Sequence, residues 1–165
     1  MKLIPLTQGK FAMVDDEDYE YLSQFKWQAT KSRNTFYATR KTGAKPRQGF
    51  SMHREILSSG KITDHKDGNG LNNQRSNLRN ATLAQNCQNA ARSSSKIPFK
   101  GVDFPIRKDG RKWWTRYRAT IDVEKRRIHL GYFKNPISAA MAYDAAALKY
   151  HGDFARTNFP KESTL

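Results

Sequence analysis

Sulfur, acidic charge and long apolar segments are all scarce in this sequence. Cys87 is the single cysteine among 165 residues, which excludes an internal disulfide and a cysteine-rich zinc site. No apolar run approaches the ~18 residues of a membrane-spanning helix. The first residues also lack the hydrophobic stretch and cleavage site of a secretory signal. We therefore expect a cytoplasmic protein in a reducing compartment, with no membrane partner.

Acidic residues are outnumbered two to one by basic ones. The chain has 15 Asp and Glu against 30 Lys and Arg, a net charge of +15. Residues 1–25 have a net charge of −3, whereas residues 26–135 hold 25 basic and 7 acidic side chains. Such a surface attracts polyanions and binds them with strongly salt-dependent affinity. Because the basic segments also contain Trp, Tyr and Asn, we expect a nucleic-acid partner rather than a merely basic soluble protein.

The apolar content is low for one large core. Hydrophobic residues make up 37% of the chain and the mean hydropathy is −0.86, so two small modules fit better. The first module is predicted to hold a hairpin over 3–14, a helix over 15–25, paired strands at 27–29 and 36–40, and a helix over 81–91. A polar linker is predicted at 92–98, and residues 99–160 predict three strands and a helix that begins at Asn135-Pro136 and ends at Gly152. The expected fold class is α+β.

Residues 64–89, DHKDGNGLNNQRSNLRNATLAQNCQN, are the most chemically informative segment. Asp64 offers a carboxylate and Asn86 offers an amide oxygen, and both are hard ligands suited to one divalent cation such as Mg²⁺ or Mn²⁺. His65 titrates near neutral pH and fits a base that activates water. On a strongly basic chain, this combination predicts hydrolysis of a phosphodiester bond.

Three other interpretations of this segment are weaker. An EF-hand needs an oxygen ligand at its third position, where this sequence has Lys66. A zinc site needs more His or Cys close by. A plain Asx-rich turn with a surface histidine needs no ligand, and Asn86 and the basic context argue against it.

The segment resembles the HNH endonucleases, in particular the phage and intron homing type with a ββα-metal core. The matching pattern covers Met52-His53-Arg54 and then Asp64 to Asn89, and residues 3–27 resemble the segment that often precedes it. The resemblance implies that Asp64 and Asn86 bind one metal ion and that His65 is the general base. It also implies that Asn69 and Asn77 brace the loop between two strands. Asparagine at the third motif position favours Mg²⁺ or Mn²⁺ over zinc.

Four nearby residues each have two interpretations. Asn89 lies one turn beyond Asn86 and is an alternative ligand. His53 either contacts phosphate or lies beside the site, or it is a strand histidine with satisfied hydrogen bonds. Arg54 and Arg79 either stabilise phosphate charge or are solvated surface residues.

Basic and aromatic residues are interleaved on the predicted strands of the second module. A ribbon of two or three strands fits a major groove, where arginine reads guanine and phosphate contacts set the position. The residues that this composition places at DNA include Arg107, Arg111, Trp113, Arg116, Arg118 and Arg127.

Residues 99–159 also resemble the APETALA-two/ethylene-response-factor DNA-binding domain. The matching pieces are FKGV (99–102), RATI (118–121), RIHLGYF (127–133), AAMAYDAAALKYHGD (139–153) and TNFP (157–160). In that family a sheet enters the major groove of double-stranded DNA and a helix packs behind it. By position, the resemblance implies DNA contacts at Lys100, Arg116, Arg127 and Tyr132.

The second module departs from that family at three positions. Asp103 and Asp122 replace basic contact residues, and His129 replaces a tryptophan. These departures weigh against the family's GC-rich target and leave groove binding in place.

Together these features predict a metal-dependent DNA endonuclease of phage or mobile-element type. The nuclease module is expected at 1–91, with its core at 51–91, and the DNA-binding module at 99–160. We expect it to nick one strand and leave 3′-hydroxyl and 5′-phosphate ends, and to cut both strands only as a homodimer. The alternatives are a DNA-binding regulator with an inactive core, an RNA nuclease, and a defence or toxin nuclease of low specificity.

Overall fold

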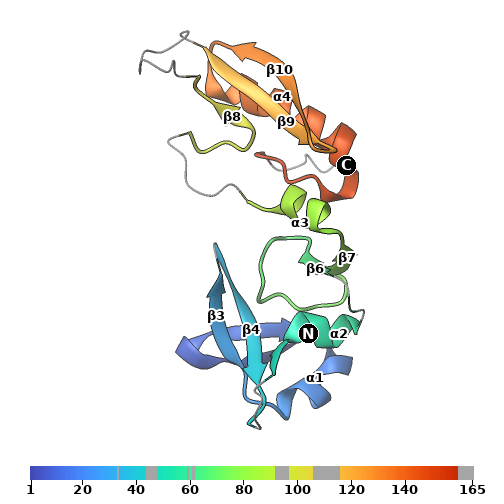
Figure 1. Cartoon of the computed structure of the whole chain (residues 1–165). Helices are drawn as coiled ribbons and strands as arrows, with labels where there is room; N and C mark the ends of the chain where they lie inside the picture. The colour runs from blue at the N-terminus through green and yellow to red at the C-terminus, as the bar shows by residue number, and fades with distance from the viewer. Residues whose placement is uncertain are drawn as a thin grey trace. The chain divides into compact units, whose positions relative to one another are not determined.

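The protein has a mixed α+β fold, as the sequence predicts, built from small antiparallel sheets and short helices (Figure 1). The computed structural model describes residues 1–32, 34–43, 48–58, 60, 62–91, 97–105 and 116–159. It divides into two compact units, Met1–Asn89 and Ala90–Leu165. Within the described ranges, no helix is long and apolar enough to cross a membrane.

The first unit begins with the predicted hairpin and helix. Strands β1 (Lys2–Pro5) and β2 (Phe11–Val14) pair antiparallel around the 3-10 turn η1 (Thr7–Gly9). Helix α1 (Asp16–Ser23) follows, with three acidic residues in its first turn, where negative charge favours the helix dipole. Ile4, Val14 and Leu22 are buried from these elements and contribute to one hydrophobic core.

A three-stranded sheet and a short helix complete the support for the site. The sheet has the order β3 (Gln28–Ser32), β4 (Thr35–Lys41), β5 (Gly49–Ser51). Residues 52–57 form helix α2 (Met52–Leu57), so the alternative that His53 is a strand histidine is wrong. Met52 and Ile56 explain the difference, because residues four apart share a helix face and both are buried in the core.

The motif segment folds as two strands and a helix. Strand β6 (Ile62–His65) pairs antiparallel with β7 (Leu78–Ala81), and α3 (Leu83–Asn89) follows directly. Figure 1 shows the three elements together within the first unit. The register sets Asp64 opposite Arg79 and His65 opposite Leu78.

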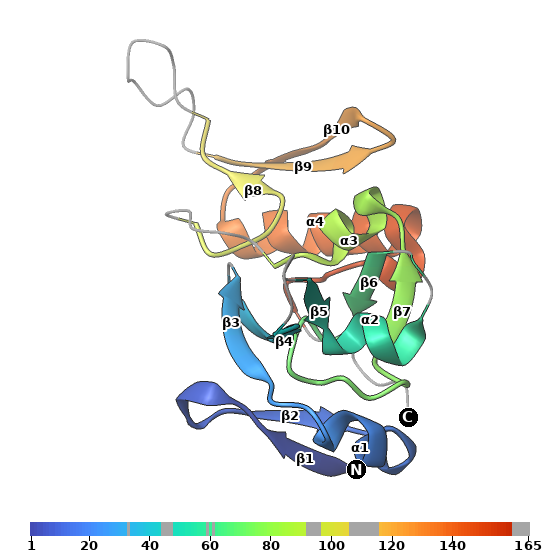
Figure 2. The same cartoon turned by 60° about the horizontal axis from the view of Figure 1, so that its bottom comes forward.

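The second unit is a three-stranded sheet covered on one face by a helix (Figure 2). The strand order is β10 (Arg126–Phe133), β9 (Tyr117–Val123), β8 (Val102–Asp103), followed by α4 (Pro136–His151) and the 3-10 turn η2 (Gly152–Phe154). Asn135 caps α4 as predicted, because its side chain accepts a hydrogen bond from the Ser138 N–H at 2.7 Å. Ala119 and Ile121 of β9 are buried against the alanine-rich face of α4.

The Asn-Phe-Pro segment near the end of the chain has a packing role. Asp144 of α4 is buried, and its carboxylate accepts from the backbone N–H groups of Asn158 and Phe159 at 2.8–3.0 Å. The Asn158 side chain in turn joins both backbone groups of Lys100. The predicted linker at 92–98 falls largely outside the described residues.

Candidate functional site

Asp64 lies at the centre of a buried polar cluster. Its side chain is only 5% exposed, and on its Oδ2 it accepts a hydrogen bond from Arg79 Nε at 2.8 Å, with Arg79 Nη2 2.7 Å from the same oxygen. From α3, the Asn89 amide donates to Oδ1 at 3.0 Å and to Oδ2 at 3.1 Å. A second donation from Asn89, to the His65 carbonyl at 2.8 Å, ties α3 to the end of β6. Oδ1 therefore keeps accepting capacity toward further partners.

Asn86 lies on the same helix, three residues before Asn89. Residues three apart share a helix face, so its side chain belongs to the side of α3 that meets β6. The side chain is half-buried. Among the described residues it has no recorded side-chain hydrogen bond, while its backbone N–H donates to Thr82. The structure therefore brings Asn89 to Asp64 directly and leaves the amide oxygen of Asn86 available.

His65 is held by Asn73, an asparagine that the motif alone does not assign to the site. Asn73 is fully buried, and its Oδ1 lies 3.3 Å from Nε2 of His65. The Asn73 amide nitrogen donates to the Leu71 carbonyl at 3.3 Å, which leaves Oδ1 as the acceptor toward the ring. Nε2 then carries the proton, and Nδ1 is the nitrogen with a free lone pair. The signal in the sequence was the Asn72-Asn73 pair of the motif, but nothing there distinguishes which of the two faces the histidine.

Two further rings enclose the imidazole of His65. His53 of α2 lies edge-on to it at 5.1 Å between ring centroids, and Tyr37 of β4 lies 5.7 Å from it. Burial lowers the pKa of His65, partly opposed by the Asn73 hydrogen bond and by Asp67 and Asp64. Burial also lowers the pKa of His53, to about 3, and the neighbouring His65 adds to the effect. Both imidazoles are therefore neutral at pH 7, and His53 lies beside the site as a helix residue whose Nδ1 has no partner in the described part of the chain.

The loop between β6 and β7 is braced by asparagine side chains. Asn77 donates to Asp67 Oδ1 at 3.0 Å and to the Asn72 carbonyl at 2.9 Å, and it accepts from the Asp67 N–H at 3.1 Å. Asn69 accepts from the Leu71 N–H at 3.1 Å. Gly70 lies against β4, where a Cβ would be 2.5 Å from the Phe36 carbonyl oxygen. This packing fixes the path of the chain toward Asn73.

The donor set fits a hard cation that retains water. A carboxylate oxygen of Asp64 and the amide oxygen of Asn86 are the ligand types that Mg²⁺ and Mn²⁺ prefer. Within the described ranges, no group of three or more His, Cys, Asp or Glu is placed to hold a metal ion. An all-protein zinc site does not match this donor set, whereas an ion that completes its shell with water and phosphate oxygens does.

Comparison with known proteins identifies relatives of this chain. The chain is 32% identical over 159 residues to an uncharacterized HNH endonuclease of Acanthamoeba polyphaga mimivirus, a match that covers 92% of this chain and 76% of that protein. The chain belongs to the HNH endonuclease family. A scan against models of protein families finds no match.

A second comparison concerns the C-terminal unit of this HNH protein. Over 74 residues the chain is 39% identical to ethylene-responsive transcription factor 3 of Nicotiana tabacum. The matched segment covers 44% of this chain and 30% of that protein. The match is therefore to one part of a longer protein.

The residues predicted at DNA in this unit divide into three groups. Four of them lie on β9 and β10: Arg118, Arg127, His129 and Tyr132. The rings of His129 and Tyr132 lie 4.6 Å apart between centroids and are tilted by 54°. Arg116 is exposed just before β9, whereas the ammonium of Lys100 donates to the Ala90 carbonyl at 2.8 Å. Arg107, Arg111 and Trp113 lie outside the described residues.

The arginines of the first unit differ in exposure. Arg54 is exposed on α2. Arg79 is mostly buried and engages Asp64, so it is part of the cluster rather than a solvated surface residue.

Proposed function

We propose that this HNH protein is a metal-dependent endonuclease that hydrolyses phosphodiester bonds of double-stranded DNA. The observation that carries the proposal is the end of β6, where Asn89 and Arg79 hold a buried carboxylate and Asn73 holds a neutral imidazole. The family and the net charge of +15 support a polyanionic substrate. The partial likeness to a transcription factor supports a role for the C-terminal sheet in binding the duplex.

Each residue of the cluster has a defined role in this proposal. His65 accepts the proton of the attacking water at Nδ1, since Asn73 holds the proton on Nε2. Asp64 and Asn86 would hold one Mg²⁺ or Mn²⁺, which supplies positive charge to the phosphate and to the leaving 3′ oxygen. Asn89 positions Asp64 through its two amide hydrogen bonds. The products are 3′-hydroxyl and 5′-phosphate ends, one nick per site, so a double-strand break requires a homodimer.

One observation favours a second candidate, a DNA-binding regulator with an inactive core. Arg79 already neutralises Asp64, as a purely structural ion pair would. Against this, Nε and Nη2 of Arg79 both approach Oδ2, while among the described residues Oδ1 accepts from the Asn89 amide. The nuclease proposal makes use of that remaining capacity, and the regulator proposal does not.

Titration of plasmid nicking with Mg²⁺ tests the metal assignment. Asn86→Ala should raise the Mg²⁺ concentration for half-maximal rate by about tenfold or more, because a ligand is lost. Its melting temperature should stay within a degree or two of wild type, since the side chain has no recorded hydrogen bond in the described structure.

Asn89→Ala is the matched comparison on the same helix. It removes three buried hydrogen bonds and should lower the free energy of unfolding by about 1–3 kcal/mol in addition to slowing the reaction. If Asn86→Ala leaves the Mg²⁺ dependence unchanged and only Asn89→Ala shifts it, Asn89 is the ligand instead. If no divalent cation supports nicking by the wild-type protein, the proposal fails.

A further inference from the structure

Two arginine–aspartate pairs lie on the face of the C-terminal sheet that α4 does not cover. Arg118 of β9 donates to Asp103 of β8 from Nε at 2.9 Å and from Nη2 at 2.7 Å. Arg127 of β10 donates to Asp122 of β9 from Nε at 2.8 Å and from Nη2 at 2.9 Å. Each pair is formed between neighbouring strands, so each carboxylate fixes an arginine across the sheet.

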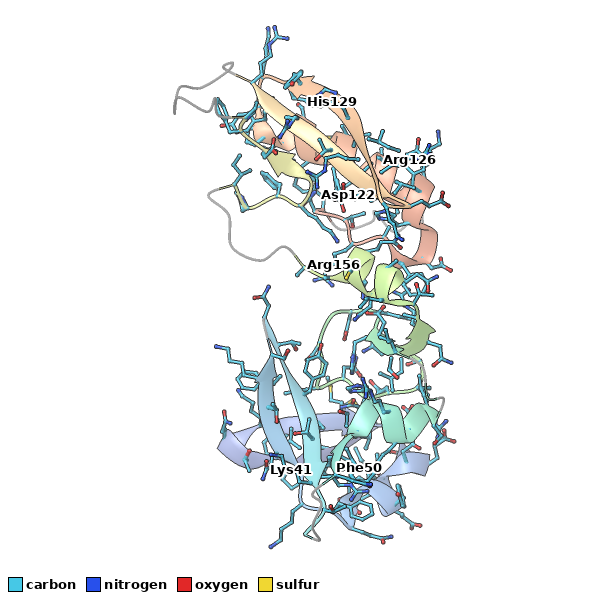
Figure 3. All side chains as sticks on the ribbon, viewed as in Figure 1. Lys41, Phe50, Asp122, Arg126, His129 and Arg156 are labelled. Atoms are coloured by element: carbon cyan, nitrogen blue, oxygen red, sulfur yellow. The ribbon has the colours of Figure 1, made fainter. Side chains whose placement is uncertain are left out.

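The strand register places both pairs on the same face. Arg118, Thr120 and Asp122 alternate along β9 with Ala119 and Ile121, which are buried against α4. Their partners on β10 are Tyr132, His129 and Arg127, in that order. A bulge between His129 and Gly131 keeps these three side chains on the same face. Figure 3 labels Asp122 on β9 and His129 on β10.

The geometry of both pairs leaves the same edge of each guanidinium free. An arginine has two donor edges, a side edge made by Nε and Nη2 and an end edge made by Nη1 and Nη2. The carboxylates occupy the side edge in both pairs. Within the described structure the end edge has no protein partner, and it carries the two parallel N–H donors that bind O6 and N7 of guanine.

The presence of Asp103 and Asp122 on this face is not what a purely electrostatic DNA-binding surface would need. Residues 26–135 hold 7 acidic against 25 basic side chains, and two of the seven lie on this face. A carboxylate beside DNA repels phosphate and lowers affinity for every sequence. Holding an arginine in one orientation offsets that cost, because the side chain then loses less conformational freedom on binding a base.

We propose that Asp103 and Asp122 are positioning residues that hold Arg118 and Arg127 as two guanine-reading side chains. The inference rests on the proposed binding of duplex DNA by this sheet. Arg127 lies opposite Asp122, which is four residues from Arg118 on β9. The two arginines are therefore separated by about 14 Å along the strands, or about four base-pair steps of 3.4 Å. The sheet therefore selects two guanines a few base pairs apart, with His129, Tyr132 and Thr120 between them.

Selection from a random duplex library tests the assignment, using the full-length chain with His65→Ala so that bound DNA is not cut. Asp103→Asn should weaken the preference for guanine at one position of the site, and Asp122→Asn should weaken it at the other. At the same time, each variant should bind random duplex as tightly as the parent or more tightly, because one negative charge is gone. Arg118→Lys should reduce the guanine preference at the Asp103-dependent position about tenfold or more while keeping the charge.

Arg126→Lys is the matched control, since Arg126 is exposed on β10 next to Arg127 and has no carboxylate partner among the described residues. The DNA sequence that Arg126→Lys selects from the library should be the same as the sequence selected by the parent. If Asp103→Asn and Asp122→Asn raise binding to all duplexes equally and leave the selected bases unchanged, the carboxylates do not orient the arginines and the inference is overturned. The proposed nuclease function still holds after that result if the wild-type chain nicks plasmid. If the full-length chain binds no duplex at all, the nuclease function and the role of the carboxylates are both contradicted.

Discussion

His65 is the residue on which the proposed chemistry depends, and its surroundings predict a pH profile. A general base must be neutral, and burial lowers the pKa of His65 below its usual value of 6.5. The single-turnover nicking rate should therefore rise with pH, with a midpoint below 6.5, and be level at neutral pH. Measuring the rate from pH 4.5 to 8 with saturating Mg²⁺ checks this. A midpoint above 7 would show that His65 is not the buried neutral base described above.

His53 carries a second prediction at the residue scale, on stability. Its pKa of about 3 in the folded protein is below the usual 6.5, so the unfolded chain binds the proton more readily between those values. Stability from this residue is therefore complete above pH 6.5 and is lost as pH falls toward 3, by up to about 5 kcal/mol.

Chemical denaturation at pH 7 and pH 4.5 measures that loss. His53→Gln removes the titrating ring and should reduce the difference in unfolding free energy between the two pH values. His129→Gln, which changes an exposed histidine, should leave the difference as in wild type. Equal pH dependence in all three proteins would contradict the buried, neutral state of His53.

At the scale of elements, the strands and helices with strong local signals followed from the sequence. The β1–β2 hairpin has Gln8 and Gly9 with φ near +63° at its turn, and α4 has an Asn-Pro start and a glycine end, so local chemistry sets their bounds. Helix α2 was not predicted, because six residues with Met52 and Ile56 buried give too short a pattern to separate helix from strand. The Asn73–His65 and Asp103–Arg118 contacts depend on tertiary register, which single-residue patterns do not specify.

Gly101, just before β8, predicts a large effect of one added methyl group on the stability of the second unit. Gly101 has φ of +74°, and a Cβ there would lie 1.9 Å from Cδ2 of Tyr143 on α4. Gly101→Ala should push β8 away from α4 and lower the free energy of unfolding by about 2–4 kcal/mol. Gly152→Ala is the control, since Gly152 has φ of +53° but nothing within 4 Å, and it should cost the backbone strain alone, about 1–3 kcal/mol and less than Gly101→Ala. Equal losses in the two variants would show that strain at positive φ, and not contact with Tyr143, sets the cost.

At the scale of the whole molecule, composition indicated the class of binding partner more fully than the residue pattern indicated the contacts of the candidate active site. A net charge of +15, concentrated in residues 26–135, indicates a polyanion, and membership of the HNH family agrees with it. The sequence also singled out Asp64 and His65, which lie at the end of β6 in the structure. It did not identify Asn73, or Asn89 as the direct partner of Asp64, because both depend on how the loop and α3 fold back on β6.

The most direct test of the whole account is the single-turnover rate of nicking of supercoiled plasmid by His65→Ala, with enzyme in excess and Mg²⁺ present. The account predicts that this variant binds the plasmid as tightly as wild type and nicks it about 10²–10⁴ times more slowly, which is the contribution of a general base. A rate within a few fold of wild type at equal binding would contradict the assignment of His65 and, with it, the proposed active site.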